Sequence, residues 1–336
     1  MDHYLNVNIK INEKNKTKLS LPQKRNFFSW SNYIIPLKHV KKERDLVRHL
    51  KRLSTMDIET IEFNGKQTPI AISCACTSTF KDKLFLIDKD LLLSNSGEAV
   101  VKLFKDYVSY LIENHYYFEN IFAHNLGSFD GYFLFQNLSK IIEPDNITTI
   151  IDNQNKFIQI RIDVNNHIFT WRDSNRIFPV SLKDLCKNFG VEGKSSSYNI
   201  KFNNLSLFED NELLKEFKKY SLQDSVALLD ALLKAQTIYY NKYEVDLAEA
   251  LSTSTLSLRI FRKHLLSQNI PIIKGKHDDF IRKSYLGGAT DYYQGVGEGV
   301  YCYDVNSLYP LAMKQGMPGD IIGEYALILR ISSVSV

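Results

Sequence analysis

Acidic side chains recur in this sequence at spacings that could bring them onto one metal ion. Asp57 and Glu59 stand two residues apart in a stretch with the pattern of a strand, and side chains at that spacing point to the same face of a strand. Carboxylate oxygens suit Mg²⁺ or Mn²⁺, and a pair of such ions can hydrolyse a phosphodiester bond. An isolated Asp-x-Glu pair is more often part of the charged surface than of a metal site. Whether this pair binds metal therefore depends on the other acidic residues.

The second acidic position is Asp130, which follows a short apolar stretch at 121–123 and a glycine-containing turn at 124–129. A turn of this kind would place Asp130 at the edge of a sheet, where the sites of open α/β sheets lie. The alternative is an aspartate that caps a helix beside a glycine turn.

The third acidic position is Asp224, which lies on a long predicted helix four residues after Tyr220. Residues at this spacing share a helix face, so the phenol and the carboxylate point the same way. A buried carboxylate needs a partner, which a metal ion would supply, and the phenol could then orient an attacking water. The alternative is a partly exposed aspartate beside a core tyrosine.

Taken together and in order, these motifs resemble the exonuclease domain of family B DNA polymerases, in particular the protein-primed branch of phages, mitochondria and linear mitochondrial plasmids. The family's D-x-E, N-x(2–3)-F-D and Y-x(3)-D motifs are matched by Asp57 and Glu59, by Asn125, Phe129 and Asp130, and by Tyr220 and Asp224. The resemblance covers about residues 56–317. It implies a ribonuclease H-like 3′→5′ exonuclease in which those four acids hold two Mg²⁺ or Mn²⁺ ions and Tyr220 takes part in catalysis.

Further residues acquire roles only through this resemblance. Residues that match those holding the unpaired primer end are Thr60, His124, Asn125 and Phe129. Lys183 is similar to a catalytic-site lysine of the family. A Y-x-G-G motif that touches the template strand is matched by Tyr285, Gly287 and Gly288.

The stretch 304–310 matches the D-x-x-S-L-Y-P motif of the family's palm domain. The resemblance makes Asp304 a ligand of the polymerase metals, and it makes nucleotide-binding residues of Ser307, Leu308 and Tyr309. The later K-x-x-x-N-S-x-Y-G and D-T-D motifs do not occur in this sequence. We therefore expect a truncated palm, incomplete polymerase chemistry and no primer extension by this chain. The glycines at 295–299 lack the spacing of a nucleotide loop and are interpreted as a turn before a strand that leads to Asp304.

Hydrophobic periodicity predicts the elements that would hold these residues. A three-stranded meander is expected at 56–61, 68–77 and 84–87, then a helix at 97–115, a strand at 121–123, an apolar segment at 132–135, alternating residues at 147–172 and a long helix at 210–243. This order is typical of an α/β fold. Together with the resemblance, it implies a mixed sheet with helices and three parts: a basic arm at 1–50, the exonuclease domain at 51–245, and a linker and the start of a palm domain at 246–336.

Composition sets outer limits on the function. A net charge of +4 in 336 residues is compatible with phosphate partners but does not demand them. Four cysteines at 74, 76, 186 and 302 lack the second close pair of a zinc site, so we expect them to be reduced. No apolar run approaches the length of a membrane span, and no signal peptide is expected.

Expected partners are single-stranded and primer-template DNA, a possible terminal protein, and dNTPs only if the palm were complete; no membrane is expected. Richness in Asn, Ile and Lys fits a mitochondrial or mitochondrial-plasmid genome, with a viral or cytoplasmic location as the alternative. Two other functions stay open. One is a stand-alone DEDD-type exonuclease acting on RNA or DNA, against which the 304–310 motif argues. The other is a gene remnant that at most binds single-stranded DNA or a terminal protein.

Overall fold

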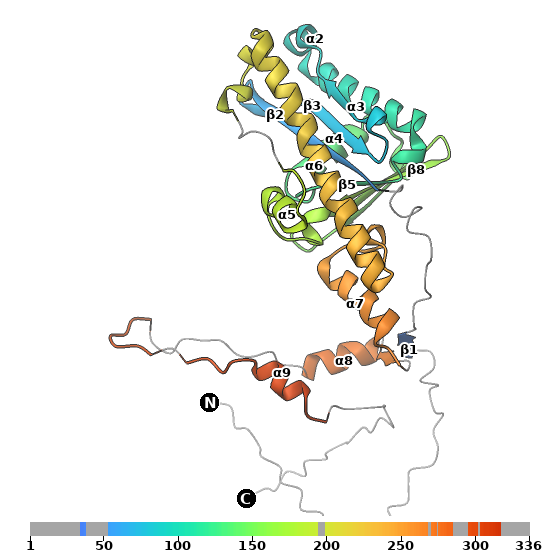
Figure 1. The fold of residues 1–336 in the computed structure, drawn as a ribbon, viewed down its shortest axis with the longest axis vertical. Coiled ribbons are helices and arrows are strands. Elements are labelled where there is room, and N and C mark those ends of the chain that lie inside the picture. Colours follow the sequence, from blue (N-terminus) through green and yellow to red (C-terminus); the bar gives the residue numbers. More distant parts are fainter. Residues whose placement is uncertain are drawn as a thin grey trace, which may run out of the picture. The chain divides into compact units, whose positions relative to one another are not determined.

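The computed structural model describes residues 34–37, 53–193, 199–267, 270–273, 275–284, 295–301 and 303–316. The chain divides into two compact units (Figure 1): one is Lys38–Gln268, and the other joins Met1–Leu37 with Asn269–Val336. The first unit contains all of the expected exonuclease domain and extends beyond its predicted limits at both ends. The assignment of residues 246–336 to a linker and palm stays a prediction.

A mixed sheet of seven strands forms the centre of the Lys38–Gln268 unit, in the order β4-β3-β2-β5-β8-β7-β6. Its strands are β2 (Leu53–Phe63), β3 (Lys66–Cys76), β4 (Lys83–Leu86), β5 (Asn120–Ala123), β6 (Ile147–Ile151), β7 (Phe157–Val164) and β8 (His167–Asp173). Strand β5 runs parallel to β2 and β8, and the other neighbours are antiparallel. The predicted meander and the α/β class are thereby confirmed.

The hairpin between β2 and β3 turns at Asn64 and Gly65, whose φ angles are 51° and 72°. Two successive positive φ angles are characteristic of the Asn-Gly hairpin turn, whose twist matches that of the strands. The two strands pair from Ser54 to Phe63, with one register shift between Glu59 and Thr60. The strand that carries Asp57 and Glu59 is therefore fixed along its length by an antiparallel partner.

Helices cover both faces of this sheet. The α-helices are α2 (Lys89–Ser94), α3 (Ser96–Glu113), α4 (Asp130–Leu138), α5 (Leu182–Phe189), α6 (Asn211–Tyr243) and α7 (Thr253–His264). Short 3₁₀ turns connect them: η2 (Thr79–Lys81), η3 (His115–Tyr117), η4 (Pro144–Asn146), η5 (Ser174–Arg176), η6 (Ile200–Asn203), η7 (Leu205–Phe208) and η8 (Leu247–Glu249). The long helix α6 begins where Asp210 accepts the backbone N–H groups of Glu212 and Leu213, a polar cap that satisfies two otherwise unpaired donors.

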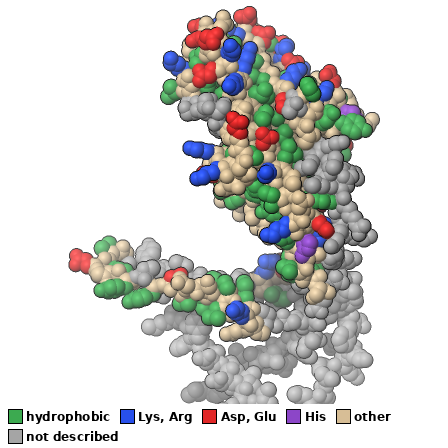
Figure 2. Space-filling model, viewed as in Figure 1, with side chains coloured by type: hydrophobic (Ala, Val, Ile, Leu, Met, Phe, Trp, Pro, Cys, Tyr) green, Lys and Arg blue, Asp and Glu red, His purple; other side chains and the backbone are tan. Residues whose placement is uncertain are grey.

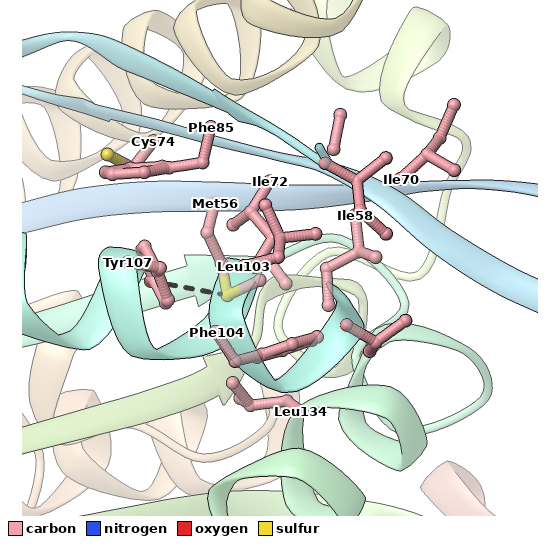
Figure 3. Close-up of a cluster of buried hydrophobic side chains, with 14 of the residues drawn as sticks. Met56, Ile58, Ile70, Ile72, Cys74, Phe85, Leu103, Phe104, Tyr107 and Leu134 are labelled. Carbon is pink, nitrogen blue, oxygen red and sulfur yellow. Dashed lines mark hydrogen bonds between the residues drawn. The ribbon is translucent and has the colours of Figure 1, made fainter. Parts of the chain in front are cut away.

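One face of the sheet packs on α3 through a large apolar cluster. Met56 and Ile58 of β2 point towards Leu103 and Tyr107 of α3 (Figure 3). The Tyr107 hydroxyl donates to the Met56 sulfur at 3.6 Å and accepts the indole N–H of Trp171 at 3.2 Å. Each fully buried side chain of this size contributes roughly 1.5–3 kcal/mol, so this face anchors the strand that carries the acids.

The described cysteines are buried residues, as predicted, and their reduced state stays a prediction. Cys74, Cys76 and Cys186 are buried, and burial raises the pKa of Cys76 to about 11. Cys302 lies outside the described residues. Among the helices that the structure describes, none is long and apolar enough to cross a membrane.

The second unit contains a two-stranded antiparallel sheet, in which β1 (Ile34–Leu37) pairs with β9 (Ile270–Ile273). The Lys38–Gln268 unit is thus inserted in sequence between two strands that pair. Helices α8 (Lys276–Ser284) and α9 (Leu308–Met313) follow. The segment 295–316 exposes large apolar side chains, which Figure 2 shows as green. The expected strand before Asp304 is wrong for the described residues, since none of 300, 301 and 303–305 is in a strand.

Candidate active site

Three carboxylates from two elements converge on one point. Asp57 and Glu59 of β2 and Asp224 of α6 each offer an oxygen within 4.8 Å of the others. The two strand residues are half-buried, whereas Asp224 is only 5% exposed. The same-face geometry predicted for the Asp-x-Glu pair is what allows both strand acids to meet the helix acid.

The close approach of α6 to the sheet depends on small side chains. Ser73 of β3 is the register partner of Asp57, and its hydroxyl is hydrogen-bonded to that of Ser225 at 2.6 Å. The Thr55 hydroxyl donates to the Ser225 carbonyl at 2.7 Å. These contacts hold α6 at the residue next to Asp224. Both elements carry small buried residues: Ala71, Ser73 and Ala75 on β3, and Ser221, Ser225 and Ala227 on α6.

Asp130, the first residue of α4, reaches back towards β2. It is 2% exposed, and its Oδ1 accepts the Ile58 N–H at 3.0 Å. Burial, followed by the charge of Asp57, raises the pKa of Asp130 well above its usual range. The alternative of a helix-capping aspartate is wrong, because Phe129 occupies the N-cap position and Asp130 bonds across to the sheet. The fourth predicted acid therefore lies beside the cluster of three.

Tyr220 lies on the same buried side of α6 as Asp224, as predicted. Its ring packs against Phe202 with the ring centroids 5.7 Å apart. Lys183 is exposed near the start of α5, and its catalytic role stays a prediction.

The residues predicted to hold the DNA strand differ in their exposure and in their hydrogen bonds. Phe129 is 39% exposed and packs edge-on against Phe133, so part of its ring is available for stacking. The Thr60 hydroxyl donates to Oε1 of Gln67 at 2.8 Å. Asn125 is exposed, and its φ of 78° turns the chain sharply after β5.

His124 is already engaged with the protein. Its Nδ1 lies 2.9 Å from the Ser174 hydroxyl and its Nε2 lies 2.7 Å from the Val180 carbonyl. This geometry gives the ring a role in holding the turn after β5. A direct contact of His124 with DNA stays a prediction.

Two glycines, one in the predicted turn and one in the first turn of α4, are required by close packing. A Cβ on Gly127 would lie 2.6 Å from the Phe157 carbonyl oxygen, and a Cβ on Gly131 would lie 2.6 Å from that of Leu126. Both distances are too short for a real carbon, so a larger residue would displace the backbone that carries Asp130.

Sequence reasoning missed Asp173, the last residue of β8. Its carboxylate accepts the backbone N–H groups of Asn125, Gly127 and Asn175 at 2.9–3.0 Å, and its charge adds to the effects that raise the pKa of Asp130. The available signal was weak: an aspartate at the end of a predicted strand, in a stretch that matched none of the motifs.

The residues predicted to serve a polymerase site belong to the other unit. Asp304, Ser307, Leu308 and Tyr309 are all exposed, and Ser307 precedes α9 with a φ of 58°. Tyr285, Gly287 and Gly288 lie outside the described residues. The metal and nucleotide roles of this group stay predictions.

The donor set at the cluster fits a divalent cation. Hard carboxylate oxygens from three side chains converge, and like charges at this separation repel one another unless a cation lies between them. Half-burial of the strand acids leaves one side of the cluster open. The site can therefore hold metal with protein ligands and admit a further oxygen ligand.

Comparisons with known proteins show the family of this chain. The family described as DNA polymerase type B, organellar and viral, matches residues 112–210 and 195–331. A probable DNA polymerase of Agaricus bitorquis is 30% identical over 317 residues, covering 81% of this chain and 39% of that protein. One of Ascobolus immersus is 27% identical over 325 residues, covering 82% of this chain and 26% of that protein.

A solved structure of Phi29 DNA polymerase complexed with single-stranded DNA has a TM-score of 0.51 at 15% identity, covering 71% of this chain and 40% of that one. At that identity the likeness shows the fold, which agrees with the predicted class. The chain spans less than half the length of these relatives. Since the family match covers more than half of the sequence, the chain belongs to the organellar and viral family of type B DNA polymerases.

Proposed function

We propose that this chain provides the proofreading 3′→5′ exonuclease of a DNA polymerase, acting on single-stranded or frayed DNA ends. The observation that carries the proposal is the convergence of Asp57, Glu59 and Asp224 within 4.8 Å, with Asp130 bonded to the strand beside them. Family membership supports DNA as the substrate. A partly exposed Phe129 supports an unpaired end, because an aromatic face stacks on a base that is free of its partner.

Each residue has a defined task in this proposal. Asp57, Glu59 and Asp224 would hold Mg²⁺ or Mn²⁺, with Asp130 completing the acidic set. Bound divalent ions supply an activated water and stabilise the charge that develops on the phosphodiester. Tyr220, one helical turn before Asp224 and supported by Phe202, orients the attacking water through its phenol. Phe129 stacks on the terminal base.

The test compares two acidic pairs of equal spacing. Changing Asp57 and Glu59 together to Ala should lower digestion of a single-stranded oligonucleotide at least about a thousandfold, because transition-state stabilisation by the ions is lost. The matched control changes Glu143 and Asp145 together to Ala. This exposed pair lies at the start of η4, with Glu143 at the N-cap, and its loss should leave the rate unchanged. Release of labelled nucleotide with Mg²⁺ or Mn²⁺, with and without EDTA, measures both.

Two results would contradict the proposal. One is undiminished digestion by the Asp57/Glu59 double variant. The other is equal digestion of blunt duplex and single strands, since the proposed site admits an unpaired end.

Template-directed nucleotidyl transfer is a second candidate function, because the family match extends to residue 331 and so includes the 304–310 motif. The two later palm motifs do not occur in this sequence, so the expectation stays that this chain by itself does not extend a primer. In this proposal Asp304 contributes a metal ligand, and Tyr309 contacts the incoming nucleotide. Primer extension that Asp304→Ala abolishes would support this activity. Extension that survives the substitution would exclude Asp304 as a metal ligand.

A further inference from the structure

Asp173 lies where two parallel strands end together. It is the register partner of Ala123 in the β5–β8 ladder, so the loop after β5 passes directly beside it. Its side chain is only 6% exposed. An isolated buried carboxylate is unfavourable, and hydrogen bonds to its oxygens are what stabilise it in such a position.

Both oxygens of Asp173 are occupied by backbone donors. Oδ1 accepts the N–H groups of Asn125 and Asn175, each at 2.9 Å, and Oδ2 accepts the Gly127 N–H at 3.0 Å. Hydrogen bonds to an ionised acceptor are stronger than those between neutral groups. Two of the three donors belong to the 124–130 loop, which leads from β5 to α4.

The 124–130 loop follows a path that few sequences could take. Asn125 has a left-handed φ of 78°, a conformation that costs a residue with a side chain roughly 1–2 kcal/mol. A Cβ on Gly127 would lie 3.2 Å from Oδ2 of Asp173 and closer still to the Phe157 carbonyl. The bonds to Asp173 offset the cost of this conformation.

The far end of the same loop is held by the active-site strand. Asp130 accepts the Ile58 N–H at 3.0 Å, and the Gly131 N–H donates to the Leu126 carbonyl at 2.8 Å. Asp173 therefore fixes the beginning of the loop and Ile58 fixes its end. Between these two points lie Phe129 and the backbone that sets the position of Asp130.

We propose that Asp173 is a positioning residue of the exonuclease, whose carboxylate holds the 124–130 loop so that Asp130 reaches the acidic cluster and Phe129 faces the DNA strand. The first part of this inference concerns the loop and the metal site, and the second part rests on the proposed function. The alternative is that Asp173 only caps η5 by accepting the Asn175 N–H. In that case, replacing Asp173 would leave the 124–130 loop and the metal site unaffected.

The experiment exchanges the carboxylate for an amide in the full chain. Asp173→Asn keeps the size of the side chain but sets an NH₂ group against one of the loop's N–H donors. The matched control is Asp210→Asn, which makes the same exchange at an acid that accepts two backbone N–H groups at the start of α6. Both variants are measured for thermal unfolding, Mn²⁺ affinity by calorimetry, kcat and KM on a single-stranded oligonucleotide, and amide hydrogen exchange.

Asp173→Asn should remove the exchange protection of the Asn125 and Gly127 amides and weaken Mn²⁺ binding about 10- to 100-fold, with a fall in kcat of the same order. Asp210→Asn should lower only the unfolding temperature. The inference is wrong if Asp173→Asn matches the control in Mn²⁺ affinity and in kcat/KM.

Two measurements separate this inference from the proposed function. A wild-type protein that binds Mn²⁺ but digests no DNA would overturn the exonuclease, while Mn²⁺ affinity and amide exchange would still decide the role of Asp173. If Asp173→Asn does not fold, amide hydrogen exchange in the wild-type protein tests the inference. The Asn125 and Gly127 amides must then be protected from exchange. The substitutions compared are then Asp173→Glu, which keeps the charge and both oxygens, and Asp173→Ser, which does not. Asp173→Glu should retain the higher Mn²⁺ affinity.

Discussion

Asp130 is a titratable carboxyl group in a buried position. Its carboxyl is 2% exposed beside Asp57, and burial and that neighbouring charge raise its pKa well above 3.8, although the Ile58 N–H acts in the opposite direction. In the metal-free protein the fold therefore favours the protonated acid. A cation at the cluster would favour the ionised acid, so the same residue couples metal binding to stability.

The raised pKa has a defined effect on metal-free stability. The contribution of Asp130 is fully present below about pH 4 and is lost as the pH rises through its higher folded-state pKa. Asp130→Asn retains an acceptor for Ile58 and removes the charge. In EDTA the variant should therefore melt above the wild type at pH 8, and the difference should shrink towards pH 4.

Thermal melts between pH 4 and pH 8 check this expectation, with the exposed Asp145→Asn as the control. Saturating Mn²⁺ should stabilise the wild type more than Asp130→Asn. A variant that melts below the wild type at pH 8 in EDTA would show that the buried charge is not a cost to the fold.

At the scale of elements, the contact between α6 and the sheet sets the geometry of the site. Helix α6 contacts both β2 and β3 (Figure 1), and the polar contacts of Thr55, Ser73 and Ser225 lie beside Asp224. Burial along this helix does not follow its apolar residues alone. Val226 and Leu233 are half-buried, whereas Ser221 and Ser225 are buried, because the helix approaches the sheet over small residues.

The Ser73–Ser225 pair should behave as a coupled unit. Changing either serine alone to Ala should lower the free energy of unfolding by about 1–3 kcal/mol, because a buried hydroxyl loses its partner. The double variant should cost less than the sum, with a coupling of about 1 kcal/mol, since neither hydroxyl is then left unpaired. Urea unfolding of the four proteins measures the cycle.

The control for this cycle is Ser139→Ala, which removes an exposed hydroxyl bonded to the Gln136 carbonyl. It should change stability by no more than about 0.5 kcal/mol. Strictly additive costs for the two buried serines would show that their hydrogen bond does not couple the helix to the sheet.

At the scale of the molecule, the two units differ in how their described residues are stabilised. The Lys38–Gln268 unit has a seven-stranded sheet with helices on both faces, and Figure 2 shows acidic and basic side chains interspersed on its visible surface. The described sheet of the other unit has only two strands. Two-stranded sheets are marginally stable by themselves.

Limited trypsin digestion should therefore leave resistant material from the seven-stranded sheet and its helices, within 53–267, because cleavage follows local opening and the larger core opens least. Mass spectrometry of the resistant material checks its limits. Leu103→Ala, which removes a buried core side chain at a cost of about 2–5 kcal/mol, should make this material susceptible. A resistant fragment that retains 303–316 would contradict the expectation.

The sequence by itself determined the elements and most of the acids of the site. Alternation along 56–61 and the helical period of 210–243 depend on neighbours only a few residues apart, so they are visible without a fold. The same locality fixes Asp57 with Glu59 on one strand face, and Tyr220 with Asp224 on one helix face. The order of the motifs was enough to predict the polymerase family.

Only the tertiary structure decided which of these elements and side chains lie next to one another. The closeness of Asp224 to Asp57 depends on the small Ser73 and Ser225, which lie 152 positions apart. Asp173 matched none of the motifs, and its role appears only when β8 pairs with β5. The burial of Asp130 arises in the same way, through a bond to Ile58, 72 positions away. Such contacts depend on packing between distant segments, which local periodicity does not encode.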